Sequence, residues 1–422
     1  MLLCFVFPGY AEEVVIKSFD GNGTLTWSNS LVEGMGTVEW ASSLAGPWSR
    51  NWRPLIDIPI TGSVMTASVP MFYRVVRRTY SPLTNQMAEV TYDSVDKTFY
   101  EANSNSYPYG YATYQKGGPE YTFYMSIYEI SNTEFCEFLN DAEANQDNEL
   151  GTNMFFCSSP SGFIYMDSTQ TGLELLFDRN ASKLIYDDGQ PVGSRYSVTI
   201  STPVGGGSYS NHPVAGMSWY GAVKYCNWFT IKEGRGITQR CYTEGDQPVE
   251  WAPVTAQSWD MDLFTYEERT NWLSYQGFRL PMLYNGSAPT SLELNERYKA
   301  AAWHGTTNML YGFGRNLIGG FDANYSSSGD PYDNASTPCG YYNGSDHGGS
   351  FQTRSNENFY GIYDLSGNVT EWTAAGGGCD GCFGSTIDPC KTTASIGSDH
   401  GVASARNSAD YTRGFRIVST YP

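Results

Sequence analysis

The sequence predicts an α+β fold with much irregular chain, preceded by a small all-β domain. Its 422 residues exceed one typical domain and indicate two or three. Hydrophobic residues make up 40%, enough for a sizeable core, whereas charged residues make up only 16%. The chain also holds 45 Gly and 32 Tyr. This composition is typical of a loop-rich, aromatic protein and not of a coiled coil or a helical bundle.

The charge and hydropathy of the chain exclude two classes of partner. The formal net charge is −19 at pH 7, from 44 acidic and 25 basic residues. Nucleic acid would be repelled by this charge, so we expect no nucleic-acid binding. No apolar run approaches the roughly 20 residues that a membrane helix needs, so we expect no membrane span. An excess of carboxylates does suit hard cations such as calcium.

The N-terminal segment has the pattern of an export signal. Residues 1–8 are almost wholly apolar, and Gly9-Tyr10-Ala11 then precedes two acidic residues. Small residues at both ends of such a tripeptide are typical of cleavage after a secretory signal. We therefore expect residues 1–11 to be a signal-peptide remnant and the protein to be secreted, periplasmic or on the cell surface. The alternative is a buried first strand.

Eight of the nine cysteines lie beyond that segment, and an even number in an exported chain permits disulfides without fixing their pairing. Cys379 and Cys382 have the two-residue spacing of a redox or zinc motif. No second pair completes a zinc site, so a local disulfide or free thiols are expected there. The eight are Cys136, Cys157, Cys226, Cys241, Cys339, Cys379, Cys382 and Cys390.

Residues 12–80 are expected to form the small β domain. Gly21-Asn22-Gly23 is a turn signal, and short alternating stretches at 24–27 and 37–40 predict half-buried strands. Residues 71–76 are expected to form the closing strand. The segment carries no cluster of catalytic residues, so a binding or spacer role is the default.

The remainder of the chain is predicted to be a linker and one large domain. Residues 81–118 are polar and rich in Tyr, Asn and Ser, which indicates a linker that includes the first strand of the next domain. Within residues 119–422, helical signals are confined to three segments. Ser131 and Ser218 cap the first two, and the third runs from about Leu294 to Trp303. The long loops between them are uncommon unless a ligand, a metal or a function orders them.

Five segments of the large domain, in order, resemble one family. Together they span roughly 300 residues, and the resemblance is to the formylglycine-generating-enzyme family, also called sulfatase-modifying factors. It implies a C-type-lectin-like α+β fold over about 119–422, usually with bound calcium. The segments are Tyr128–Phe135 with Phe138–Asn140, His212–Tyr220, Gly277–Pro281, Tyr360–Trp372 and Arg413–Arg416.

The resemblance implies two calcium sites. The first would use the side chains of Asn368 and Glu371 and the carbonyl of Val369. The second would use the Asn324 side chain and the Tyr325 carbonyl. In the matching downstream loop the family often places an Asp where this chain has Gly340, and Asp330 or Asp333 could substitute. Amide, carboxylate and carbonyl oxygens are the ligands that calcium prefers. The alternatives are a hydrogen-bonded turn and a metal-free polar loop.

The catalytic chemistry of the family depends on copper, which we do not expect here. Active members convert a sulfatase cysteine to formylglycine with oxygen and a copper ion held by two cysteines, four residues apart, before the final Gly-Phe-Arg. Soft Cu(I) requires such thiolates. This chain has no cysteine after Cys390. Cys382 and Cys390 are the only weak candidates for a displaced pair, so whether the chain is an enzyme stays open.

Two further residues are expected to be structural, and a third has no assigned role. Arg279 is expected to be structural and paired with an acid, and a helix resembling the one that follows it in the family is delayed to residues 296–301. His212 is expected to be structural. His347 lies in a Gly-rich loop with no evident partner.

Three functions remain open from the sequence. The first is a non-catalytic, exported member of the family that binds or scaffolds, with loops between 351 and 412 presenting Tyr, Asn, Ser and Asp to a protein or carbohydrate ligand. The second is an active formylglycine-generating oxidase with a displaced cysteine pair. The third is a calcium-dependent carbohydrate-binding protein.

Overall fold

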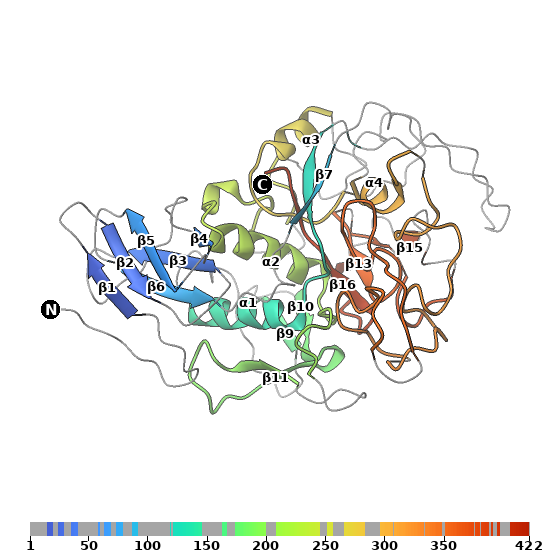
Figure 1. The fold of residues 1–422 in the computed structure, drawn as a ribbon, viewed down its shortest axis with the longest axis horizontal. Helices are drawn as coiled ribbons and strands as arrows, with labels where there is room; N and C mark the ends of the chain where they lie inside the picture. Colours follow the sequence, from blue (N-terminus) through green and yellow to red (C-terminus); the bar gives the residue numbers. More distant parts are fainter. Residues whose placement is uncertain are drawn as a thin grey trace. The chain divides into compact units, whose positions relative to one another are not determined.

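The chain divides into two compact units, Met1–Pro82 and Leu83–Pro422 (Figure 1). Expectations for residues 1–11, for residues 92–118 and for Cys157 fall outside the residues described here. None of the helices described has the length and apolar character needed to span a bilayer. The computed structural model describes residues 15–19, 24–28, 35–40, 58–59, 63–68, 73–78, 87–91, 119, 121–145, 163–166, 174–199, 208–244, 251–255, 266–282, 296–306, 308–332, 334–347, 351–374, 376–379, 381–387, 390, 395–396 and 406–421.

Antiparallel strands make up the described part of the first unit. They pair in two sheets, in the orders β1-β2-β5 and β4-β3-β6. In β2 the side chains of Leu25 and Trp27 are buried and their neighbours are half-buried, which is the two-residue period predicted there. The strands are β1 (Val15–Phe19), β2 (Thr24–Ser28), β3 (Met35–Trp40), β4 (Ile58–Pro59), β5 (Val64–Ser68) and β6 (Tyr73–Arg78).

The second unit is mixed, as the α+β prediction requires. Its strands form small sheets in the orders β17-β8-β7, β15-β14-β13-β16, β10-β9 and β11-β12. The helices are α1 (Asn132–Ala144), α2 (Trp219–Lys232), α3 (Tyr266–Leu273) and α4 (Glu296–Ala302), with 3₁₀ turns at Arg179–Ala181 and Ile237–Gln239. The strands are β7 (Met87–Val90), β8 (Phe123–Ser126), β9 (Phe163–Met166), β10 (Glu174–Asp178), β11 (Leu184–Tyr186), β12 (Tyr196–Val198), β13 (Thr370–Trp372), β14 (Gly378–Cys379), β15 (Ser395–Ile396), β16 (Arg413–Phe415) and β17 (Val418–Ser419).

The helix starts follow the caps predicted from the sequence. Ser131 and Glu134 form a reciprocal capping box at the start of α1, and Ser218 accepts from the Gly221 N–H at the start of α2. Helix α4 corresponds to the third predicted segment. Helix α3 was not predicted, because its eight residues are mostly polar; Trp272 in its last turn is deeply buried.

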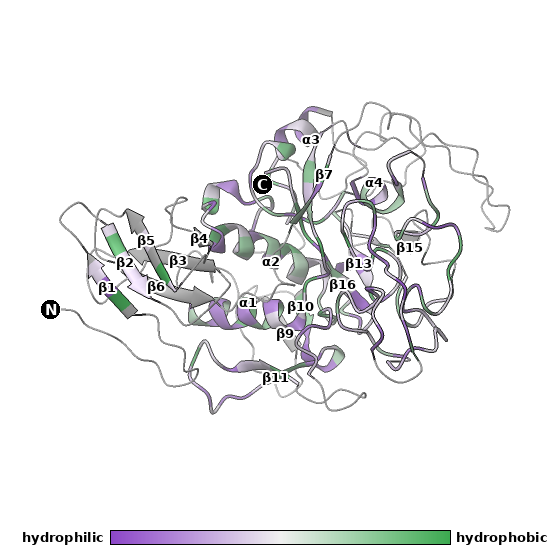
Figure 2. Cartoon of the chain, in the orientation of Figure 1, coloured by the Kyte–Doolittle hydropathy of each residue, from purple (hydrophilic) through white to green (hydrophobic). Residues whose placement is uncertain are grey.

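Aromatic side chains from α1 and α2 form the main core of the second unit. Phe135 stacks on Tyr225 with ring centroids 5.9 Å apart, and Phe138 lies 5.3 Å from Trp228. Phe415 of β16 lies 5.2 Å from Tyr225, so the C-terminal strand packs on the same cluster. Figure 2 shows both hydrophilic and hydrophobic residues along α1, as expected of a helix that covers a core with one face.

The expected partner of Arg279 is Glu296, the first residue of α4. The Arg279 Nη1 and Nη2 atoms lie 2.5 and 2.6 Å from the two carboxylate oxygens, and both side chains are buried. The Met282 N–H donates to the same carboxylate at 3.0 Å. This geometry confirms the structural role predicted for Arg279, since a buried bidentate pair is stable only when both partners are present.

We predict that His212 makes stability depend on pH. Its ring is 1% exposed and lies 4.7 Å from the Tyr209 ring and 5.3 Å from the Tyr332 ring. Burial lowers the pKa of His212 from 6.5 to about 4. Between about pH 4 and pH 6.5, His212 therefore binds a proton more readily in the unfolded chain than in the folded chain. The contribution of the neutral His212 ring to stability is complete above about pH 6.5 and is lost as the pH falls towards 4.

Lowering the pH from 7 to 5.5 should cost about 1 kcal/mol of unfolding free energy through this group. Urea denaturation of the parent protein and of His212→Gln at both pH values measures this cost. The variant should show a smaller loss of stability over that interval. An equal loss in both proteins would contradict the prediction.

Candidate functional site

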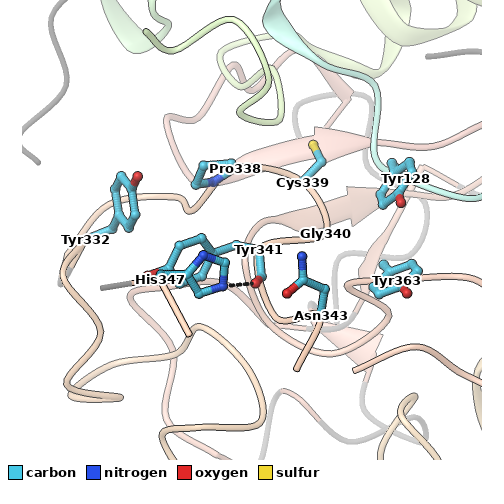
Figure 3. Close-up of a pocket in the computed structure, with 9 residues that line it drawn as sticks. All are labelled: Tyr128, Tyr332, Pro338, Cys339, Gly340, Tyr341, Asn343, His347 and Tyr363. Carbon is cyan, nitrogen blue, oxygen red and sulfur yellow. Dashed lines mark hydrogen bonds between the residues drawn. The ribbon is translucent and has the colours of Figure 1, made fainter. Parts of the chain in front are cut away.

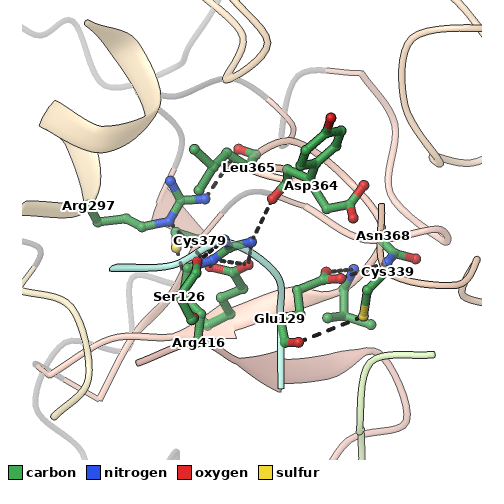
Figure 4. A network of polar contacts seen from close by, with 12 residues as sticks. Ser126, Glu129, Arg297, Cys339, Asp364, Leu365, Asn368, Cys379 and Arg416 are labelled. Carbon is green, nitrogen blue, oxygen red and sulfur yellow. Dashed lines mark hydrogen bonds and ion pairs between the residues drawn. The ribbon is translucent and has the colours of Figure 1, made fainter. Parts of the chain in front are cut away.

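A network of buried ion pairs lies next to the pocket that is described below (Figure 4). Strands β13 and β16 pair in parallel, with Glu371 opposite Gly414, and this pairing brings Arg416 to the Glu371 carboxylate. The Arg416 Nε atom lies 2.7 and 2.8 Å from the two carboxylate oxygens, and its Nη2 lies 2.6 Å from Oε1. Arg297 of α4 approaches the same carboxylate at 3.3 Å. All three residues are at most 1% exposed.

The structure does not bring Glu371 and Asn368 together in one oxygen-lined site. The Asn368 amide nitrogen donates to Glu129 at 2.8 Å, and the Val369 N–H faces the same carboxylate at 3.4 Å. Glu371 instead contacts two guanidinium groups. A carboxylate that balances two buried cations could bind calcium only by leaving them uncompensated, which is costly. Glu371 is therefore a poor calcium ligand in this arrangement.

The two asparagines that the resemblance assigned to separate calcium sites contact each other. The Asn324 carbonyl accepts from the Asn368 N–H at 2.8 Å, and the Asn324 Nδ2 lies 3.4 Å from the Asn368 Oδ1. The Asn324 Oδ1 is buried and accepts no hydrogen bond from the described residues. Tyr325 contributes differently, because its carbonyl accepts from the Ser328 N–H at 3.0 Å in a turn.

Two more buried carboxylates flank the network. Asp364 accepts from the Gly340 N–H at 2.6 Å and from Asn356 at 2.7 Å, and burial raises the pKa of Asp364. Burial also raises the pKa of Glu129 well above its usual value, and the nearby Asp364 and Glu371 carboxylates raise it further. Three carboxylates thus share a buried region with two guanidiniums. A proton on Glu129, or a bound cation, would offset the excess negative charge.

The oxygens around Asn324 are not paired with guanidinium groups, but they do not converge on one point. Asn368 donates its amide nitrogen to Glu129, and its Oδ1 accepts from the Thr337 N–H at 2.9 Å. Asn324 Oδ1, Asn368 Oδ1 and the Glu129 carboxylate are oxygen donors of the kind that calcium binds. Among the described residues, however, no group of three or more His, Cys, Asp or Glu side chains could hold a metal ion. Calcium binding to this chain therefore stays a prediction.

The candidate copper ligands have separate contacts. The Cys382 sulfur lies 3.2 Å from the Ser385 Oγ. The Cys390 thiol donates to the Thr386 carbonyl at 3.6 Å and lies in a small apolar cluster. Residues 397–405, which precede the final Gly-Phe-Arg, lie outside the described residues. The seven described cysteines, which include both candidates, are buried thiols.

An open pocket of about 460 Å³ lies beside the network (Figure 3). Its walls carry four tyrosines, one histidine and one amide: Tyr128, Tyr332, Tyr341, Tyr363, His347 and Asn343. Pro338, Cys339 and Gly340 complete the lining. None of these nine side chains is acidic, and none is a lysine or an arginine. We define these nine residues as the tyrosine pocket.

Aromatic pairs hold the two sides of the tyrosine pocket. Tyr128 stacks on Tyr363 with centroids 5.3 Å apart, and Tyr341 stacks on His347 at 3.9 Å. Tyr332 meets Tyr341 edge-on at 5.4 Å. Figure 3 shows the first pair on one side, the second pair and Tyr332 on the other. His347, which had no evident partner in the sequence, is thus part of an aromatic wall.

The sequence did not predict this pocket, although its parts lie in segments that were noted. Tyr128 and Tyr363 belong to two of the five resembling segments, and each directly precedes a carboxylate of the network, Glu129 or Asp364. The abundance of tyrosine was the signal available. It could not locate the pocket, because the lining comes from three separate segments and Tyr128 is more than 200 residues from the other two.

Comparison with solved structures returns proteins of low sequence identity. A Treponema denticola variable protein 1 is 16% identical, with a TM-score of 0.40, and covers 81% of this chain and 98% of its own. The protein CarF is 18% identical (TM-score 0.39; 80% of this chain and 98% of its own). PvdO from Pseudomonas aeruginosa is 13% identical (TM-score 0.39; 79% and 93%).

A search of curated proteins found no match. The family model for the sulfatase-modifying factor enzyme 1-like domain matches residues 120–377, which is more than half of the chain. The match includes α1, α2, α4, β13 and the whole tyrosine pocket. The chain therefore belongs to the family of sulfatase-modifying factor enzyme 1-like domain proteins.

Proposed function

We propose that this chain is a non-catalytic, ligand-binding member of its family. The tyrosine pocket is the observation that carries the proposal. Its volume of about 460 Å³ lies within the rough range of 300–1,000 Å³ found for small-molecule sites. Aromatic walls with a few polar groups are typical of recognition, since they supply contact area and orient a ligand.

The thiol of the pocket supports binding over catalysis. Cys339 is buried, and its Sγ lies 3.7 Å from the Glu129 carbonyl. Burial, and then the neighbouring Glu129 carboxylate, raise the pKa of Cys339 well above its usual value. Because the thiolate is the nucleophile and the metal ligand, a thiol held protonated is poorly suited to either role.

The protein should not oxidise a cysteine in a sulfatase-derived peptide. Copper chemistry in this family needs two facing thiolates, and no cysteine follows Cys390 in the chain. The assay incubates reduced, copper-loaded protein with the peptide in air and follows its mass. The peptide mass should stay unchanged, while an active formylglycine-generating enzyme in parallel should convert it.

Turnover would favour the oxidase hypothesis instead. Replacing Cys382 or Cys390 with Ser would then show whether the pair is displaced to these positions. Loss of turnover in either variant, with Cys136→Ser unaffected, would make the protein an oxidase and would overturn the proposed function.

Calcium binding is a second part of the proposal, with a structural role. The Asn324 Oδ1 and the Glu129 carboxylate would hold the ion, and its charge would offset the buried carboxylates. The support is the buried Asn324 Oδ1 without a hydrogen-bond partner among the described residues, together with the raised pKa of Glu129. An unsatisfied buried acceptor costs roughly 1–3 kcal/mol, which a bound cation would offset.

Calcium should raise the melting temperature of the parent protein relative to a sample in chelator, because binding to the native state adds to its stability. Asn324→Ala should abolish this shift. Asn316→Ala, which replaces an exposed asparagine in the same unit, should retain it. Differential scanning fluorimetry measures all three proteins. An unchanged melting temperature in the parent protein would reject calcium and favour a purely hydrogen-bonded loop.

A further inference from the structure

We propose that the tyrosine pocket binds a neutral pyranose ring, either a free sugar or the terminal residue of a glycan. The inference deepens the proposed function and rests on it. It does not require calcium, because the pocket residues named below, and not the Asn324 region, would contact the sugar.

Flat aromatic faces are the first requirement. The rings of the Tyr128–Tyr363 pair are inclined by 22° and those of the Tyr341–His347 pair by 20°, so each pair is a face-to-face stack that leaves only outer ring faces for a ligand. The C–H face of a pyranose is flat and apolar, and it packs on such surfaces. Tyrosine adds a hydroxyl at its tip and loses little conformational entropy on binding, which suits a ligand that is apolar on one face and polar at its rim.

Polar groups between the aromatic pairs supply the second requirement. The Asn343 Oδ1 accepts from the Ser345 N–H at 2.9 Å, so the amide nitrogen is the part that can donate to a ligand. Figure 3 shows this nitrogen directed towards the space between the pairs. The His347 Nε2 lies 2.7 Å from the Tyr341 carbonyl, which fixes its proton there and makes Nδ1 the acceptor of the neutral ring. One sugar hydroxyl can therefore accept from the Asn343 amide nitrogen, and another can donate to the His347 Nδ1.

The charge around the pocket selects against an anion. The lining has no cationic side chain. Glu357 accepts from the Tyr363 hydroxyl at 3.0 Å, and Asp330 accepts from the Tyr332 N–H at 2.7 Å. With a net charge of −19 for the chain, phosphorylated and carboxylated ligands are disfavoured. A quaternary ammonium ion is the competing occupant, since aromatic faces also attract cations.

Gly340 makes room for the Tyr128 wall. Its φ is +67°, and a Cβ added to it would lie 2.5 Å from the Tyr128 Cε1. Any larger residue would push the Tyr128 ring out of its place against Tyr363. The glycine is therefore part of what opens the pocket in this chain.

Saturation-transfer NMR with methyl glycosides tests the proposal. The probes are the methyl glycosides of glucose, galactose, mannose, N-acetylglucosamine, fucose and xylose at millimolar concentration, with choline and inorganic phosphate as further arms. At least one glycoside should bind, and its Kd should rise by about tenfold in Tyr128→Ala, as expected for the loss of one aromatic contact.

Three variants separate a lost contact from a lost fold. Asn343→Ala removes an exposed amide and should weaken the same glycoside with at most a small drop in melting temperature, because the Ser345 N–H that it leaves without an acceptor is exposed to water. Gly340→Ala should abolish binding by displacing Tyr128. Tyr411→Ala, at a 63%-exposed tyrosine outside the pocket, should leave the Kd unchanged.

The outcomes distinguish this inference from the proposed function. Binding of choline alone, or of none of the glycosides, would overturn the sugar inference, and choline binding would leave the ligand-binding function standing. Glycoside binding that survives both Tyr128→Ala and Asn343→Ala would place the sugar elsewhere and overturn the site. Failure of the proposed function would appear separately, as peptide oxidation in the copper assay.

Discussion

The pairing of Glu371 with Arg416 is the interaction on which the arrangement of the second unit depends. The guanidinium also donates to the carbonyls of Ser126, at the end of β8, and Tyr363, at 3.1 and 3.0 Å. One buried cation thus ties β13, β8 and the loop of the pocket wall to the C-terminal segment. Removing one partner of such a pair typically costs roughly 3–5 kcal/mol, because the other charge is left buried and uncompensated. The network therefore stabilises the fold, and among the described residues only the oxygens of Asn324 and Glu129 beside it are candidate metal ligands.

Local signals explain why much of the fold could be predicted. The caps at Ser131 and Ser218 act within one helical turn, so they are visible in the sequence. The alternation in β2 is likewise a property of five consecutive residues. The sequence predicted that Arg279 pairs with an acid, because a buried guanidinium needs a carboxylate. It did not identify Glu296 as that acid. Helix α3 gave no such signal, since a short and mostly polar helix has no apolar period.

The site was harder to predict because it depends on contacts between distant segments. Asn368 and Glu371 were grouped by their spacing, but Asn368 adopts a left-handed φ of 63° just before β13, while Glu371 lies within the strand. Their side chains diverge, towards Glu129 in one case and towards Arg416 in the other. No spacing rule could anticipate this. The proximity of Asn324 to Asn368 is also a tertiary fact, as is the stacking of Tyr128 on Tyr363 across more than 200 residues.

The network and the tyrosine pocket are parts of one construction. Tyr128 precedes Glu129, Tyr363 precedes Asp364, and the Gly340 N–H donates to Asp364. Tyr128 and Tyr363 are thus adjacent in sequence to buried carboxylates, and Tyr341 is adjacent to the glycine that donates to one of them. Walls fixed in this way are already ordered before a ligand arrives, so binding has little side-chain freedom left to remove, and preorganisation of this kind increases affinity without new contacts. In this family member the buried charges would serve recognition indirectly, by holding neutral aromatic surfaces in place.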